Sequence, residues 1–238
     1  IIYVIIVWLQ VKWTPKFRFS LKALKQLWGY GFRMFLSAVL NKIFVKIDVL
    51  IIGKIFSASA LGFYQRARSF EQMVIQYSSG SMMEVLFPLF CQIQTDTVRL
   101  KNLVLKALNA LSLVVFYLLG VLYLCADNII VVLLTDKWLL SAEYFKILLL
   151  GGYAFPFSSL LINIISSRGN SKDFLKLAAI RKIMVGVNLI VGFSFGISGY
   201  LYGFALVRAI SLVLNIIYAG KELKTPFMWF LKPMVPFV

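Results

Sequence analysis

Long apolar blocks alternate with cation-bearing connectors along this chain, and the alternation constrains its fold more than any other feature. Of the 25 Lys and Arg residues, 21 lie in the connectors. Every second connector is rich in them, so one set of connectors holds sixteen and the other set five. The poorer set contains Lys54, Arg66, Arg68, Lys137 and Lys146. This asymmetry is typical of a protein that crosses a membrane several times with its basic connectors in the cytoplasm.

Composition supports the same class. Hydrophobic residues make up 61% of the 238 and charged residues 14%, whereas a soluble domain carries about 25% charged residues. A net charge of +16 would suggest a nucleic-acid partner for a soluble protein. Here the cations are divided among connectors, so orientation explains them and we expect no nucleic-acid binding. Attraction to anionic lipid head groups is a second role expected of the cytoplasmic cations.

A helix needs about twenty apolar residues to cross the hydrocarbon, and six segments of the chain are long enough. The expected spans are 27–56, 64–92, 103–124, 144–165, 174–195 and 200–218. Half a span precedes them, and another begins near Met228. Neither end resembles a natural terminus, so we expect a piece of a longer protein, cut within a helix at each end.

The predicted fold class is therefore an all-α integral membrane protein with six full transmembrane helices and a partial helix at each end. Residues 1–26 are expected to be the end of a preceding helix and a basic cytoplasmic linker. Residues 27–220 are expected to form a six-helix lobe. Residues 221–238 are expected to be a cytoplasmic loop and the start of a further helix.

The four cations that are not counted with a connector fall inside the expected spans, where orientation does not explain them. They are Arg33, Lys42, Lys46 and Arg208. An ionisable group at the bilayer centre costs about 2.5–3.5 kcal/mol on insertion scales, so it usually faces a cavity or a partner. One hypothesis is a hydrated cationic cavity that holds an anionic head group such as a phosphate. The alternative is a set of internal ion pairs or side chains that reach toward an interface.

Asp48 and Glu84 are the acids at comparable depth. They are candidates for binding a coupling cation, and for Glu84 a structural ion pair is the alternative. Lys42 and Lys46 are four residues apart and share a helix face, whereas Arg33 and Arg208 are far from any acid in the sequence.

Catalytic and metal-binding patterns are not found in the sequence. There is no histidine, and the carboxylates are too scattered for a paired acid–base site. The two cysteines lie in apolar surroundings without metal-like spacing. The glycine-containing segments lack the Lys and Ser/Thr of a phosphate loop. We therefore expect no catalytic residues, no metal, no cofactor and no enzyme activity.

Residues 47–67 read IDVLIIGKIFSASALGFYQRA, a polar helix end followed by a turn of small residues and a second helix start. Further characteristic stretches are Trp13-Thr14-Pro15, Val85-Leu86-Phe87-Pro88 with Gln92 and Gln94, Asp136-Lys137-Trp138 followed by Ala142, Phe155-Pro156, and SSRGN at 166–170. In their order and spacing, these stretches resemble the polysaccharide-exporter branch of the bacterial oligosaccharide flippases. That branch contains the O-antigen and colanic-acid-exporter-like proteins of the MOP superfamily. The resemblance covers essentially the whole chain.

The resemblance implies a MATE-like transporter with two lobes of six helices, of which this chain corresponds to the second. Family members move undecaprenyl-pyrophosphate-linked oligosaccharide across the bacterial inner membrane by alternating access, for O-antigen, capsule or exopolysaccharide synthesis. Arg33, Lys46 and Arg208 match the family's cationic cavity by position. The implied partners are the lipid-linked oligosaccharide, membrane lipids and other glycan-assembly proteins.

Three alternatives differ in what they require of the sequence. The nearest alternative is another exporter of the same superfamily, which carries either cationic drugs or peptidoglycan precursors. An exporter of cationic drugs requires buried acids to outnumber buried bases. An integral-membrane glycan polymerase requires a large outer loop with catalytic Arg or His. A scaffold without transport activity leaves the buried charges unexplained.

Overall fold

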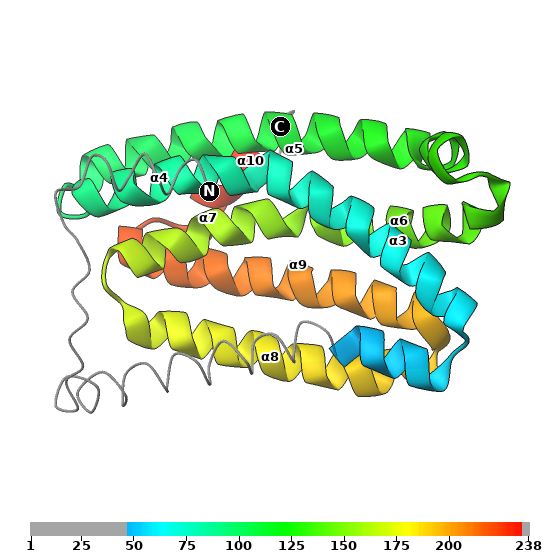
Figure 1. The fold of residues 1–238 in the computed structure, drawn as a ribbon. Coiled ribbons are helices and arrows are strands. Elements are labelled where there is room, and N and C mark those ends of the chain that lie inside the picture. Colours follow the sequence, from blue (N-terminus) through cyan, green and yellow to red (C-terminus); the bar gives the residue numbers. More distant parts are fainter. Residues whose placement is uncertain (1–46, 235–238) are drawn as a thin grey trace, which may run out of the picture. The chain divides into compact units, whose positions relative to one another are not determined.

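The computed structural model describes residues 47–234, and these form helices and no strand. The predicted all-helical class is confirmed for this part of the chain. A compact unit begins at Val49, and Figure 1 shows its helices. In chain order they are α3 (Ala58–Ile75), η1 (Gln76–Gly80), α4 (Ser81–Gln92), α5 (Thr97–Leu134), η2 (Asp136–Trp138), α6 (Leu139–Gly152), α7 (Ala154–Ser167), α8 (Ser171–Ser194), α9 (Gly196–Leu223) and α10 (Phe227–Met234). Residues 47–55 are also helical.

Side-chain caps fix where several of these helices begin. The Ser57 hydroxyl accepts a hydrogen bond from the Ala60 amide at 3.1 Å, at the start of α3. Asp96 accepts bonds from two amides at the start of α5. Asn170 accepts one from the Asp173 amide at the start of α8. Each cap satisfies amides that have no partner within the helix, so these polar residues define the boundaries.

The segment predicted as one span over 64–92 is helical throughout, with a π-helical turn in its middle. This turn is η1, between α3 and α4, and it includes most of the small polar stretch 78–81. The Ser79 hydroxyl donates to the Ile75 carbonyl at 2.9 Å. Pro88 lies inside α4. Single π-helical turns inside α-helices are frequent at functional sites, and this one lies between the α3 residues described below and the rest of the segment.

Three stretches among the described residues are long and apolar enough to cross a membrane: Thr97–Leu134, Asp136–Ser167 and Gly196–Leu223. They contain the predicted spans 103–124, 144–165 and 200–218. The helix predicted over 174–195 is present as α8, but it carries five charged residues in its first half and is not one of the three. Most of the predicted span 27–56 lies outside the described residues. The count of six spans therefore stays a prediction.

Three basic connectors meet at one end of the unit, which we call the basic end. There the Lys101 ammonium donates to the Lys224 carbonyl. The Arg168 guanidinium donates to the Gln94 carbonyl and pairs with Glu222. These contacts join the starts of α5 and α8 to the end of α9. The alternation of basic and less basic connectors in the sequence thus corresponds to a real segregation in space.

At the opposite end the start of α3 packs against the turn after α5. The rings of Phe63 and Trp138 lie 5.4 Å apart, and Arg66 lies over the Trp138 ring. The Ser141 hydroxyl donates to the Phe63 carbonyl. Trp138 thus occupies an end of the apolar helices, where aromatic side chains commonly mark a membrane interface.

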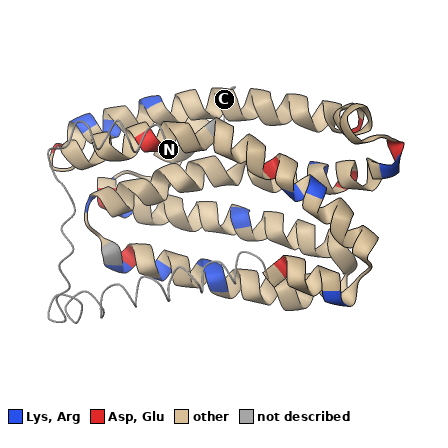
Figure 2. Cartoon of the chain, viewed as in Figure 1, with Lys and Arg blue, Asp and Glu red and all other residues tan. Residues whose placement is uncertain are grey.

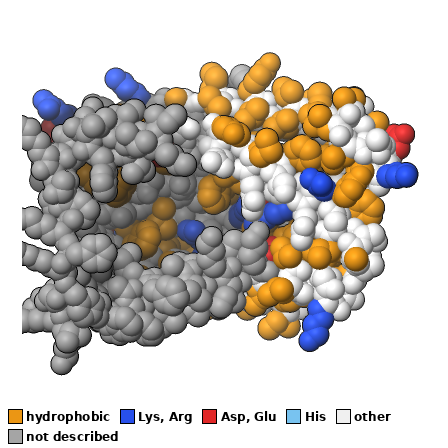
Figure 3. Space-filling model, viewed as in Figure 1, with side chains coloured by type: hydrophobic (Ala, Val, Ile, Leu, Met, Phe, Trp, Pro, Cys, Tyr) orange, Lys and Arg blue, Asp and Glu red, His pale blue; other side chains and the backbone are white. Residues whose placement is uncertain are grey.

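Apolar side chains cover much of the outside of this unit. Leu113, Tyr117, Leu124 and Val132 of α5 are each more than two-thirds exposed, and Figure 3 shows hydrophobic side chains gathered along this helix. An aqueous surface rarely carries so extended an apolar patch. The exposed face of α5 is therefore suited to contact with lipid.

Candidate functional site

The candidate site begins with Arg208, which lies near the middle of α9. It is 12 residues from Gly196 and 15 from Leu223. At 1.5 Å per residue, that places it about 18 Å and about 22 Å from the two helix ends. The side chain is 12% exposed. A guanidinium this far inside an apolar helix requires a partner, because its desolvation is otherwise costly.

That partner is Glu71 of α3, a side chain only 1% exposed. One Arg208 nitrogen, Nη1, donates to Glu71 Oε1. The second carboxylate oxygen, Oε2, accepts from Arg68 Nη1 at 2.5 Å. Each oxygen of the Glu71 carboxylate thus accepts a hydrogen bond from a different arginine. We call Arg68, Glu71 and Arg208 the Arg–Glu–Arg cluster.

Phe204 completes the cluster from α9. Its ring centroid lies 4.4 Å from Arg208 Cζ and 4.7 Å from Arg68 Cζ. Phe155 of α7 lies at 5.7 Å from Arg208 Cζ. The electron-rich face of an aromatic ring attracts a guanidinium, by about 2 kcal/mol when the contact is desolvated. Phe204 therefore compensates both cations in addition to Glu71.

Helical spacing and one glycine create this arrangement. Arg68 and Glu71 are three residues apart on α3, and Phe204 and Arg208 are four apart on α9, so each pair shares a helix face. Gly151 of α6 lies directly against α9. A Cβ at this position would lie 2.8 Å from the Ala205 Cα and 3.5 Å from Arg208 Cδ. Small residues allow such close helix contact in membranes, and here the contact helps to enclose Arg208.

The charge balance of the cluster is uneven, because two guanidiniums share one carboxylate. Figure 2 shows few charged residues along α9, so Arg208 lies in a largely uncharged helix. Arginine presents a planar set of donors that matches carboxylate and phosphate oxygens alike. The two guanidiniums therefore bind an anionic group, which is the Glu71 carboxylate in this structure, and their geometry would also suit a phosphate.

Arg208 is the one sequence-predicted cation that the structure places in the cluster. Arg33, Lys42 and Lys46 lie outside the described residues. Asp48 lies in the helical segment 47–55, and Glu84 is exposed on α4.

Sequence reasoning missed Glu71 and Arg68 as site residues. Arg68 had been counted with a connector, but it lies inside α3. Glu71 is 137 residues from Arg208 in the chain, so no local pattern pairs them. The available signal was an acid within the expected span 64–92 and a single base within the expected span 200–218.

Comparison with known proteins adds the family. Residues 1–143 match a family whose description is "Polysaccharide biosynthesis protein". This region is more than half of the 238 residues. The chain belongs to this family. The matched region of the chain includes Arg68 and Glu71 and ends before α9. The resemblance inferred from the sequence is thus confirmed at the level of the family.

Individual relatives are polysaccharide biosynthesis and transport proteins. The teichuronic acid biosynthesis protein TuaB of Bacillus subtilis (strain 168) is 28% identical over 59% of this chain and 29% of its own length. The lipopolysaccharide biosynthesis protein WzxC of Escherichia coli (strain K12) is 25% identical over 85% of this chain and 42% of its own. The succinoglycan biosynthesis transport protein ExoT of Rhizobium meliloti (strain 1021) is 25% identical over 53% and 26%.

The chain spans less than half the length of these curated relatives. No solved structure matches it significantly.

Proposed function

We propose that this chain is one lobe of a flippase that moves a lipid-linked oligosaccharide across the bacterial inner membrane by alternating access. The proposed substrate is an oligosaccharide on undecaprenyl pyrophosphate, and the product serves the synthesis of a surface or secreted polysaccharide. Membership of the polysaccharide biosynthesis family supports this, as does a relative named a transport protein. The observation that carries the proposal is the Arg–Glu–Arg cluster at mid-depth in a helix apolar enough to span the membrane.

The physical argument concerns the substrate's head group. A polyprenyl tail can stay in hydrocarbon during translocation, whereas a pyrophosphate and its sugars need a polar route. A cationic group at mid-depth lowers the energy of the phosphate where it would otherwise be highest. Arginine binds phosphate oxygens through paired, charge-assisted hydrogen bonds. In this proposal a head-group phosphate takes over one guanidinium of the cluster from Glu71.

Glu71 has a role in this proposal when no substrate is bound. A single guanidinium without a carboxylate would be costly to hold at this depth. Glu71 and Arg68 belong to α3, whereas Arg208 belongs to α9. If a phosphate replaced Glu71 as the partner of Arg208, the contact between α3 and α9 would therefore change. Such a change is one way to link head-group binding to a rocking movement between lobes. Arg33, Lys42 and Lys46 remain proposed contributors to the same cationic route, and Asp48 and Glu84 remain proposed coupling acids.

The test is glycan display by cells whose own gene is replaced with variants of the full-length protein. We expect Arg208→Ala to reduce surface glycan at least about tenfold, which corresponds to a loss of about 1.4 kcal/mol in an arginine–phosphate contact. Arg208→Lys should retain part of the display. Arg99→Ala is the matched control, because that arginine is 78% exposed at the start of α5. Each variant's amount in the membrane is measured by immunoblot.

Two results would count against the proposal. Normal glycan display by Arg208→Ala at a normal protein level would show that transport does not require Arg208 of the cluster. Full recovery of display by the apolar double variant Glu71→Met/Arg208→Met would show that the pair serves only to hold α3 against α9.

A further inference from the structure

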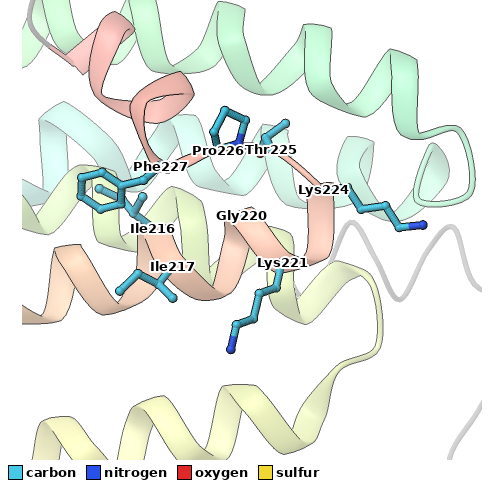
Figure 4. A pocket seen from close by; sticks show the side chains of 8 residues that line it. All are labelled: Ile216, Ile217, Gly220, Lys221, Lys224, Thr225, Pro226 and Phe227. Atoms are coloured by element: carbon cyan, nitrogen blue, oxygen red, sulfur yellow. The ribbon is translucent and has the colours of Figure 1, made fainter.

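A surface pocket lies where α9 turns into α10, away from the Arg–Glu–Arg cluster (Figure 4). Its volume is about 490 Å³, which is within the range of small-molecule sites. Figure 4 shows Ile216, Ile217 and Phe227 gathered on one side of the turn, while Lys221 and Lys224 extend in different directions from the other side. The pocket is therefore divided into an apolar half and a cationic half.

The cationic half is more strongly charged than the two lining lysines suggest. Lys221 Nζ lies 5.0 Å from the Tyr218 ring centroid, and Lys176 Nζ of α8 lies 5.8 Å from the same ring. Lys101 of α5 donates to the Lys224 carbonyl at 3.5 Å. Ammonium groups from three helices thus gather around the end of α9, where their mutual repulsion favours binding of an anion.

The nearby acid Glu222 is already engaged and faces other partners. Its carboxylate lies 3.4 Å from Arg168 Nε and accepts a hydrogen bond from Asn170 at 2.5 Å. Both partners belong to the connector between α7 and α8. Glu222 therefore holds that connector to α9, and it does not line the pocket.

Local backbone geometry at the pocket also points to a ligand. Lys224 ends α9 in the left-handed conformation, with φ of 50° and ψ of 54°. The Thr225 amide then donates to the Gly220 carbonyl at 3.0 Å. Glycine is the usual residue at this position of a helix end, and a lysine there costs about 1–2 kcal/mol. Strained positions of this kind cluster at ligand sites.

Thr225 supplies a further polar group. It lines the pocket, and its hydroxyl oxygen is buried without a hydrogen-bond partner among the described residues. A buried hydroxyl without a partner is costly, so the turn beside the pocket carries an unsatisfied polar group.

We propose that this pocket binds the phosphate of an anionic membrane phospholipid, with an acyl chain along Ile217 and Phe227. Both of these side chains are exposed, at 42% and 38%. Because α9 is long and apolar enough to span the membrane, its basic end reaches the depth of the head groups. A phosphodiester then meets the lysines while its hydrocarbon stays beside the apolar half. The ligand is a lipid of the surrounding bilayer and not the transported glycan, so this proposal does not depend on the flippase activity.

The test uses the purified full-length protein in detergent, titrated with phosphatidylglycerol and followed by native mass spectrometry. We expect Lys221→Gln/Lys224→Gly to weaken phosphatidylglycerol binding roughly thirty-fold, at about fivefold per lysine near the head groups. Glycine at 224 suits the left-handed turn, so this variant should fold at least as well as the wild type. Lys172→Gln is the matched control, since Lys172 is an exposed cation of the same end that does not line the pocket.

Two further ligands separate the possible sources of phosphate. Soluble glycerol 1-phosphate tests the head group alone, and diacylglycerol, which has no phosphate, tests the hydrocarbon alone. The proposal requires both to bind at least tenfold more weakly than phosphatidylglycerol. It is overturned if glycerol 1-phosphate binds as tightly, which would indicate a free-phosphate site. It is also overturned if the lysine variant binds phosphatidylglycerol like the wild type or if the wild type does not bind it.

Discussion

Replacement of Glu71 by Gln should destabilise the protein strongly, because it leaves two guanidiniums around a neutral amide. Glu71 is 1% exposed, Arg208 12% and Arg68 20%. Removing one partner of a buried ion pair costs about 3–5 kcal/mol. Arg68 is partly exposed and can turn toward water, so we expect the lower limit, about 3 kcal/mol. The same order follows from Coulomb's law, about 4 kcal/mol for unit charges about 4 Å apart at an effective dielectric near 20.

The assay is thermal and denaturant unfolding of the purified full-length protein in a fixed detergent. Glu71→Gln, Arg208→Gln and the double variant form a cycle whose coupling energy isolates the pair. We expect a coupling of at least about 2 kcal/mol, within the range for groups in direct contact. The apolar double variant Glu71→Met/Arg208→Met should be closer to wild type than either single variant, since similar replacements of buried ion pairs are often neutral.

The control for this cycle is Arg99→Gln, which breaks an exposed ion pair with Asp96 at 3.2 Å. Exposed pairs contribute about 0–1 kcal/mol, so this variant should remain near wild type. The reasoning is refuted if Glu71→Gln is within about 0.5 kcal/mol of wild type, or if the effects of the two single variants simply add.

Three further predictions concern helix packing and are measured by the same unfolding assay. Gly151→Leu should cost more than about 2 kcal/mol, because even a Cβ there would overlap Ala205 of α9. Asn188→Ala should cost about 1 kcal/mol through loss of its 3.1 Å hydrogen bond to the Tyr200 carbonyl between α8 and α9; a neutral result would refute this. Lys146→Gln should cost less than about 1 kcal/mol, because its ion pair with Asp127 is partly exposed, and a loss above about 2 kcal/mol would contradict the assignment.

Helix positions could be predicted well because a single physical requirement sets them. About twenty apolar residues in a row appear in the sequence without any knowledge of tertiary contacts. Helix ends were harder to place. The span predicted over 103–124 lies inside α5, and the mostly apolar residues 128–134 indicate its continuation past Asp127 to Leu134. Asp127 is tolerated there because Lys146 of α6 pairs with it at 2.5 Å, a contact between helices that the sequence does not reveal.

The candidate site was predicted only in part, for a similar reason. The depth of a residue follows from its place within an apolar block, and this identified Arg208. The partner of that arginine depends on how α3 packs against α9. Glu71 was visible as an acid within a predicted span, but nothing in the sequence connects it to a residue 137 positions away. Arg68 falls within the predicted span 64–92 but close to its start, so its charge was attributed to the preceding connector.

The measurement that tests the central claim most directly is translocation by the full-length protein in sealed proteoliposomes. A fluorescent undecaprenyl-pyrophosphate oligosaccharide is placed in one leaflet, and its appearance in the other is followed by quenching with a membrane-impermeant reagent. The account predicts that wild-type vesicles equilibrate the label much faster than protein-free vesicles, and that Arg208→Ala slows this at least tenfold while Arg99→Ala does not. Equal rates for wild-type and protein-free vesicles would contradict the flippase function. Equal rates for wild type and Arg208→Ala would contradict the role of the Arg–Glu–Arg cluster in it.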